Sequence, residues 1–291
     1  MHASLDGTGA GRAAEPPVRR LIVTADDFGA SLPINEAVEA ACTQGILTSA
    51  SLMVAGAAAA DAIARARRLP RLHVGLHLVT VCGRPVLPPE LVPDLAPGGL
   101  LPTHLGRAGV RFFFRPRVRQ QLAAELRAQF AAFEASGLPL DHVDTHCHMH
   151  LHPTVAALVL ALGPAYGLRA VRLPYDPPGG PHVADRLAGA ALRPWSRRLR
   201  ARLRRAGVRH NDALVGWWAT GRMSAERVLA AVATLPDGCS ELCLHPSTRP
   251  AAASGLPAHY WCEQEFAALV DPRVAAAITA RGIVRTSFSE W

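Results

Sequence analysis

The chain of 291 residues contains no lysine, and several other common features are also missing. No apolar run approaches the roughly 20 residues that a membrane-spanning helix requires, and the first 20 residues lack the continuous apolar stretch of a signal peptide. The six cysteines include no Cys-x-x-Cys pair, so we expect reduced thiols in a cytoplasmic protein. No glycine-rich nucleotide-binding loop follows the first apolar segment. These absences argue against a membrane-spanning protein, a secreted disulfide scaffold and a nucleotide-binding fold.

The basic charge of the chain is concentrated in one segment. All 31 basic residues are arginine; nine of them lie in residues 186–209, and the remaining 22 nearly balance the 23 acidic residues. The segment predicts a helix that opens at Pro194, with an apolar stripe formed by Leu192, Trp195, Leu199 and Leu203. Such a helix suits an anionic membrane surface, which predicts peripheral contact with the inner face of the membrane. The simpler interpretation is a surface helix whose stripe packs on the core. Few aromatic residues surround it, which argues against a nucleic-acid partner.

Short β-rich runs alternate with helical patterns along the chain. We expect seven strands, at residues 21–25, 48–55, 73–79, 140–146, 168–173, 240–244 and 283–288. The helical patterns between them cover residues 34–44, 56–68 and 117–135, then resume at 153, 194 and 263–280. Such alternation implies parallel pairing with right-handed crossovers. We therefore expect an α/β fold, a distorted or incomplete TIM-like (β/α) barrel of about seven parallel strands. It would form a single domain over residues 20–291, after a flexible tail of residues 1–19.

The segment DHVDTHCHMHLHP, residues 141–153, is unusually rich in histidine. It contains five of the 13 histidines, all at even positions, as is Asp144: His142, His146, His148, His150 and His152. Side chains two apart on a strand share a face, so six polar groups would point the same way. Because such a face needs water, mutual contacts or an ion, a metal site is favoured over a solvated tract.

The end of this segment narrows the choice of ligands. Pro153 predicts the start of a helix, so the last two histidines fall in its leading turn and are not expected to bind a metal. His146 and His148 stay as candidates, with Asp144 beside them. Cys147 would face the opposite side of the strand and is predicted to be structural.

Reactive side chains recur where the predicted strands end, which is where chemistry gathers in β/α barrels. They are Asp26 and Asp27, His77, Asp144 with His146 and His148, Arg172, and His245. Imidazole and carboxylate groups bind divalent transition metals, and such a site can polarise a carbonyl and acidify water.

Asp26 and Asp27 are adjacent at the end of a strand, so one of them can bind the metal while the other takes a proton. Arg172 could hold the second carboxylate ionised, and His245 could protonate a leaving group. Simpler interpretations are that Asp27 caps the next helix and that His77 is an ordinary core histidine.

With these residues in place, the sequence resembles the YdjC-like (ChbG-like) carbohydrate deacetylase family from about residue 20 to the C-terminus. The matching segments are LIVTADDFGAS, GILTSASLMV, GLHL, DHVDTHCHMHLHP, LRAVRLP, ELCLHP and GIVRTSF. GRPVLPP, RFFFRP and GLPLDHV resemble the hopanoid-biosynthesis-associated (HpnK-like) branch most. The sequence departs from the family at Thr24, Thr145 and Cys147, which flank the candidate ligands and bear on substrate preference.

The resemblance implies a hydrolase that removes the N-acetyl group from an amino sugar with the help of a divalent ion, Mg²⁺ or Zn²⁺. Asp27, His77 and His146 match the family's metal ligands, and Asp26 matches its general base. Arg172 and His245 match supporting catalytic positions, while Asp144 and His148 are expected to contact the substrate or support the ligands.

The branch likeness implies N-acetylglucosaminyl on a hopanoid lipid as the substrate. Alternatives are a deacetylase of soluble chitooligosaccharides, another two-His-one-carboxylate metalloenzyme such as a phosphoesterase or oxygenase, and a non-catalytic His-rich metal-binding protein. The oligomeric state is left open, with a homodimer as one possibility.

Overall fold

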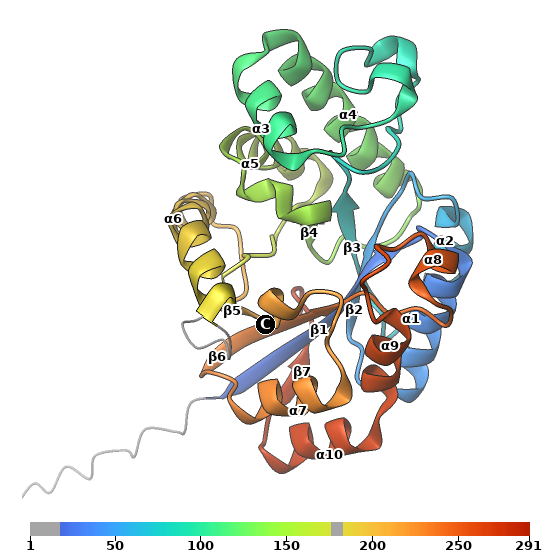
Figure 1. Cartoon of the computed structure of the whole chain (residues 1–291), viewed down its shortest axis with the longest axis vertical. Coiled ribbons are helices and arrows are strands. Elements are labelled where there is room, and N and C mark those ends of the chain that lie inside the picture. Colours follow the sequence, from blue (N-terminus) through green and yellow to red (C-terminus); the bar gives the residue numbers. More distant parts are fainter. Residues whose placement is uncertain (1–17, 176–182) are drawn as a thin grey trace, which may run out of the picture.

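One sheet of seven parallel strands organises the computed structural model, which describes residues 18–175 and 183–291. The strands are β1 (Arg19–Phe28), β2 (Ser49–Leu52), β3 (His73–Leu78), β4 (Val143–Thr145), β5 (Ala213–Val215), β6 (Gly238–Leu244) and β7 (Val284–Thr286). Their order is β4-β3-β2-β1-β6-β5, and β7 pairs with β1 (Figure 1). Most of the predicted N-terminal tail, residues 1–17, lies outside the described residues.

The sheet curves toward closure without completing a regular barrel. Between the edge strands β4 and β5, the described residues continue it as isolated parallel bridges, from Val143 to Val171 and from Ala170 to Arg209. The Leu214 amide also donates to the carbonyl of Tyr175 at 2.7 Å. The predicted distorted or incomplete β/α barrel is therefore confirmed.

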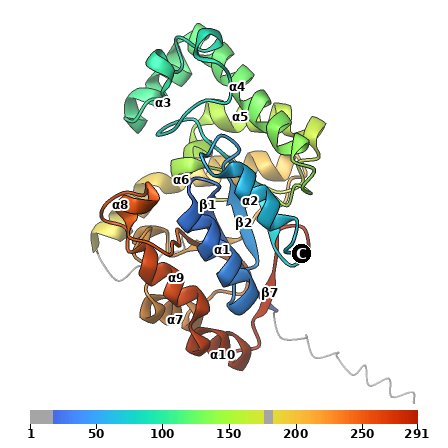
Figure 2. The ribbon, with the colours of Figure 1, turned by 90° about the vertical axis from the view of Figure 1, so that its right-hand side faces the viewer.

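Helices surround the sheet (Figures 1 and 2). They are α1 (Leu32–Gln44), α2 (Ala59–Ala66), α3 (Leu105–Phe114), α4 (Pro116–Ala135), α5 (Pro153–Leu162), α6 (Val183–Arg205), α7 (Ala225–Ala233), α8 (Ala251–Ser254), α9 (Cys262–Val270) and α10 (Pro272–Ala280). Short 3₁₀ turns occupy Pro89–Leu91, Pro97–Gly99, His146–Leu151, Gly163–Tyr166 and Trp217–Ala219. Helices α3, α4 and α5 gather at one end of the molecule, and α7, α9 and α10 at the other. No helix within the described ranges combines the length and apolar character needed to cross a membrane.

Strand β1 is central because it pairs with β2, β6 and β7. All its residues from Leu21 to Phe28 are buried, as expected for a strand covered on both faces of a parallel sheet. Its last residues therefore carry Asp26 and Asp27 into the interior at the carboxyl edge of the sheet.

Two strand predictions were wrong. Residues 168–173 make only isolated bridges, because the Leu173 amide donates to the Asn211 side chain and the following Pro174 has no amide hydrogen. The three-residue strand β5 was not predicted.

Two helix predictions also differ from the structure, and helices α3, α7 and α8 were not predicted. Pro194 lies inside α6, where it is exposed, so the helix does not open there. Helix α3 precedes the predicted helix at 117–135, and the predicted helix at 263–280 is broken between α9 and α10 by the Asp271–Pro272 step.

The stripe of α6 is divided between core and surface. Leu199 and Leu203 are 3% and 0% exposed, whereas Leu192 and Trp195 are 37% and 38% exposed. The interpretation that the stripe packs on the core is therefore correct for its second half only.

Candidate active site

Asp26 and Asp27 are both buried at the end of β1, but their carboxylates contact different groups. Asp27 has a φ of 60°, a left-handed conformation that non-glycine residues adopt mainly at turns and strained functional sites. Helix α1 is preceded by Ser31 at its N-cap position, so the interpretation of Asp27 as a helix cap is wrong.

The three predicted metal ligands lie together. Asp27 Oδ1 is 3.1 Å from Nδ1 of His146 and 3.4 Å from Nε2 of His77. The ligand atoms of the three residues all lie within 4.8 Å of one another. Burial raises the pKa of Asp27, but the nearby imidazoles outweigh it and lower that pKa, so this carboxylate is ionised. Two imidazoles and a carboxylate form a donor set that suits a divalent ion.

The orientation of His77 is set by Asp144. The two residues are register partners on β3 and β4, and Nδ1 of His77 lies 2.8 Å from Oδ1 of Asp144. Burial raises the pKa of Asp144, but Arg172 and His77 hold it at about 2, so the carboxylate accepts the bond. Nδ1 therefore carries a proton and Nε2 faces Asp27, as in histidines that bind metals through one nitrogen.

A buried charge cluster, formed by Arg172, Asp26, Asp144 and Glu241, lies beneath these residues. The Arg172 guanidinium binds Asp26 through two parallel bonds of 2.7 and 2.8 Å, donates to Glu241 at 2.9 Å, and contacts Asp144. Burial raises the pKa of Asp26, but Arg172, His77 and His245 together outweigh it and hold that pKa well below its usual range. The sequence led us to expect this orienting contact between Arg172 and Asp26.

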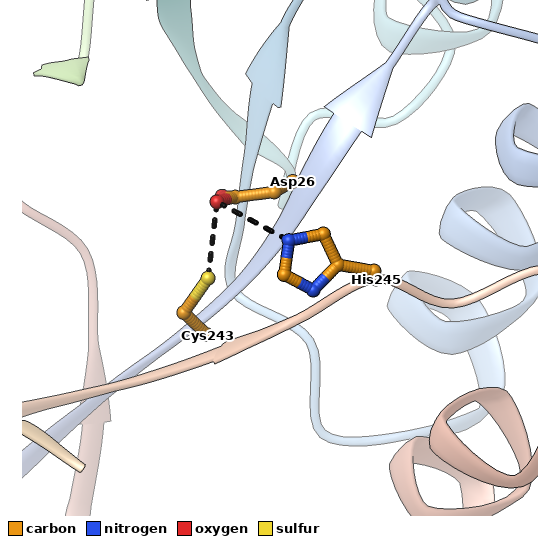
Figure 3. A group of neighbouring side chains, drawn as sticks. All are labelled: Asp26, Cys243 and His245. Atoms are coloured by element: carbon orange, nitrogen blue, oxygen red, sulfur yellow. Dashed lines mark hydrogen bonds and ion pairs between the residues drawn. The ribbon is translucent and has the colours of Figure 1, made fainter. Parts of the chain in front are cut away.

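Strand β6 brings two further groups to Asp26 (Figure 3). The Cys243 thiol donates to Oδ2 of Asp26 at 3.1 Å, and burial raises the pKa of this thiol well above its usual range. Nε2 of His245 lies 4.0 Å from the same oxygen. On the other side of His245, the Glu265 carboxylate accepts from the His245 backbone amide at 2.5 Å and lies 3.8 Å from Nδ1.

Sequence reasoning missed Cys243, Glu241 and Glu265. A signal for the first two was present, because Glu241, Cys243 and His245 alternate along β6 and so share one face. Glu265, on α9, had no such signal, because its contact with His245 depends on how α9 packs against the sheet.

The histidine-rich segment does not continue as a strand. Strand β4 ends at Thr145, and Cys147 and His148 adopt left-handed conformations with φ of 56° and 51°. The prediction that six polar groups share one strand face was therefore wrong beyond residue 145. Cys147 is exposed rather than structural.

The remaining histidines of the segment have separate roles. His142 stacks on Phe288, His150 bonds to Thr145 and to the Arg172 carbonyl, and His152 accepts from the Thr154 amide at the start of α5. Of the five, only His146 belongs to a group of converging metal-ligand atoms in the described part of the chain. His148 lies against Trp217, and its Nδ1 has no partner among the described residues. Burial lowers its pKa well below the usual range, so it is neutral.

A cavity of about 680 Å³ lies above this site. Its polar floor is formed by Asp26, His77, His146, His148 and His245. Its apolar wall is formed by Leu105, Met149, Leu151, Leu192, Trp195, Trp217 and Tyr260. The size suits a small organic ligand that has both polar and apolar parts.

Comparison with known proteins identifies the family. The family model described as YdjC-like protein matches residues 20–280. The chain belongs to the YdjC-like protein family. The YdjC-like resemblance seen in the sequence is thus confirmed, and the segments on which it rested supply the floor of the cavity.

Named relatives of this YdjC-like chain are deacetylases. A mouse protein named carbohydrate deacetylase is 34% identical over an alignment 303 positions long, which covers 92% of this chain and 93% of the relative. A Serratia marcescens protein named chitooligosaccharide deacetylase is 37% identical over 150 residues, which cover 51% and 57% of the two chains. A solved structure from Enterococcus faecalis is 22% identical, covers 93% of this chain and 98% of its own, and has a TM-score of 0.71, which shows a shared fold.

Proposed function

We propose that residues 20–291 form one domain that removes the N-acetyl group from an amino sugar with the help of a divalent metal ion. One observation carries the proposal: the ionised pair of Asp26 and Arg172 lies beside Asp27, His77 and His146, and Asp26, His77 and His146 reach a cavity of about 680 Å³. The names of the relatives support the same reaction class.

Asp27, His77 and His146 would hold the ion. The donor set fits because Asp27 is ionised and because Nε2 of His77 faces it while Nδ1 is bonded to Asp144. Imidazole nitrogens favour Zn²⁺, whereas Mg²⁺ would use the carboxylate and water. A bound divalent ion supplies Lewis-acid polarisation of the acetamide carbonyl and a lowered pKa for the attacking water.

Asp26 would accept a proton as the water oxygen bonds to the acetyl carbon. Its low pKa keeps it ionised, and Arg172 fixes both of its oxygens. A carboxylate of low pKa is a weak base, so this role requires water that is already acidified. When the carbon–nitrogen bond breaks, His245 would donate a proton to the departing nitrogen, which leaves acetate and a free amine.

The substrate would be N-acetylglucosaminyl carried by a hopanoid lipid, with the enzyme held peripherally at the inner face of the membrane through residues 186–209. The apolar wall of the cavity supports an apolar group next to the sugar. Soluble chitooligosaccharides are the second candidate, and the name of the Serratia relative favours them.

Acetate release from an N-acetylglucosaminyl lipid and from soluble chitobiose, each with and without a chelator, tests the proposal. We expect release from the lipid substrate, its loss with the chelator, and recovery when Zn²⁺ or Mg²⁺ is restored. Release from chitobiose alone would select the second substrate class. Stoichiometric metal binding with no release from either substrate would favour the non-catalytic metal-binding alternative.

A further inference from the structure

A second, smaller cavity lies beside the substrate cavity, between the start of α5 and α6. Its volume is about 270 Å³, and it shares Leu151, Pro153 and Trp195 with the larger cavity. Among the described residues that line it, the polar side chains are Arg198, Arg202 and Arg205. The three shared residues therefore stand between the proposed sugar site and this cluster of arginines.

Two of these arginines, Arg198 and Arg202, contact neutral groups. The Arg198 guanidinium lies 5.0 Å from the centroid of the Trp195 ring, and Nη1 of Arg202 donates to the Pro153 carbonyl at 2.8 Å. Neither contact involves a carboxylate, and residues 186–211 include no acid. Pro153 also begins α5, whose N-terminal end carries a partial positive charge. Guanidinium groups arranged in this way are suited to phosphate.

Helix α3, which also lines the substrate cavity, likewise lies in a segment rich in arginine and free of acidic residues. It exposes four apolar side chains: Leu105, Val110, Phe113 and Phe114 at 42%, 59%, 50% and 69%. Residues 95–124, which include α3, contain five arginines and no acid. Helix α5 contacts both α3 and α6, and the three helices lie along one side of the molecule (Figure 1). Helices α3 and α6, which both line the cavity, thus both expose aromatic and basic residues.

We propose that α3 and α6 form one docking surface for an anionic phospholipid bilayer, with a lipid phosphate bound by Arg198, Arg202 and Arg205. Exposed aromatic residues among arginines are the composition of interfacial membrane-binding helices. A symmetric dimer through this surface would place acid-free basic segments against each other, which like-charge repulsion opposes. The inference deepens the proposed membrane contact of residues 186–209 and rests on that part of the proposed function.

Vesicle co-sedimentation of the full chain, without substrate, tests the docking surface. We expect vesicles with about 30% phosphatidylglycerol to bind at least about 100-fold more tightly than phosphatidylcholine alone, because each of the three arginines near an anionic surface contributes roughly fivefold. The triple variant Arg198→Gln, Arg202→Gln, Arg205→Gln should lose roughly 100-fold in affinity for the anionic vesicles.

A matched control is Arg68→Gln, Arg71→Gln, Arg281→Gln, which removes the same charge from exposed arginines near the amino ends of β3 and β7. Its loss should stay below about threefold, since these positions lie at the edge of the sheet opposite the cavity. Equal losses in the two triple variants would overturn the proposal. Should circular dichroism show the first triple variant unfolded, Arg198→Gln with Arg205→Gln replaces it, because neither residue bonds to Pro153.

The contribution of α3 is tested by Phe113→Ser with Phe114→Ser, which should weaken binding to anionic vesicles several-fold. Unchanged binding in this variant, together with complete displacement of wild-type protein by inorganic phosphate, would show a site for soluble phosphate and overturn lipid docking. A wild-type dimer that this variant converts to a monomer would identify the surface as an interface between copies and also overturn it. Failure of acetate release would leave these binding results intact, so the two proposals fail separately.

Discussion

In the buried charge cluster, Arg172 is fully buried and bonded to Asp26, Asp144 and Glu241. On α6, by contrast, Arg198, Arg202 and Arg205 are exposed, and residues 186–211 contain no acid. Both regions adjoin the substrate cavity, and they use the same type of side chain for different purposes. Burying a guanidinium is tolerable only when carboxylates compensate its lost hydration. An exposed guanidinium keeps its hydration and can bind an external anion instead. Arginines whose lost hydration is compensated by buried carboxylates therefore position catalytic groups, whereas exposed arginines without such carboxylates are suited to an external partner.

The largest effect expected from this comparison is on stability. Arg172→Met leaves three buried carboxylates without their cation, so we expect a loss of about 3–5 kcal/mol in the free energy of unfolding. Arg198→Met, on the exposed face of α6, should change it by less than about 0.5 kcal/mol. Urea unfolding monitored by circular dichroism measures both. Similar values for the two variants would show that burial does not separate the two kinds of arginine.

The next effect is on activity and metal content. His146→Ala removes a candidate ligand, and we expect at least a roughly 1,000-fold loss of turnover, since a single electrostatic stabiliser alone is worth about 10²–10³. The His150→Ala protein should retain the metal ion, because His150 bonds to Thr145 and to the Arg172 carbonyl. It should lose about 1–3 kcal/mol in the free energy of unfolding. Metal analysis after dialysis separates the two. Normal metal content in His146→Ala would refute the ligand assignment.

A smaller loss is expected when the partner of a ligand is changed. Asp144→Asn removes the charge that orients His77, and we expect about a 10–100-fold drop in metal affinity. Asp141→Asn is the matched control, since Asp141 bonds to His142 and Ser289 and touches none of the three candidate ligands. Titration with Zn²⁺ and a competing chelator measures both affinities. Equal drops would indicate a general loss of structure.

The smallest effect is a pH dependence of stability. Burial raises the pKa of Asp141, but His142 and Ser289 hold it at about 2, below the ordinary value of 3.8. A lowered folded-state pKa gives stability that is present above about pH 4 and is lost as pH falls toward 2. We expect the difference in unfolding free energy between wild type and Asp141→Asn to shrink by about 1 kcal/mol from pH 5 to pH 3. A constant difference over that range would contradict the assigned pKa.

How far the sequence could predict the site depends on strand geometry. Asp26, His77 and His245 were correctly expected at the cavity because each ends or follows a parallel strand, and parallel strands end at one edge. Positions beyond Thr145 could not be predicted, because two left-handed residues redirect the chain and no residue type there signals them. Glu265 was out of reach for another reason, since its contact with His245 depends on the packing of a distant helix. The local sequence pattern thus reveals which strands carry polar ends, and tertiary packing decides which other residues join the site.

The central claim is that the adjacent aspartates divide the work, with Asp27 holding the metal and Asp26 accepting the proton. Metal content and acetate release measured together for Asp26→Asn and Asp27→Asn test it most directly. The account predicts that Asp26→Asn retains one metal ion per chain but loses acetate release, while Asp27→Asn loses both. Substantial acetate release by Asp26→Asn, or full metal content in Asp27→Asn, would contradict it.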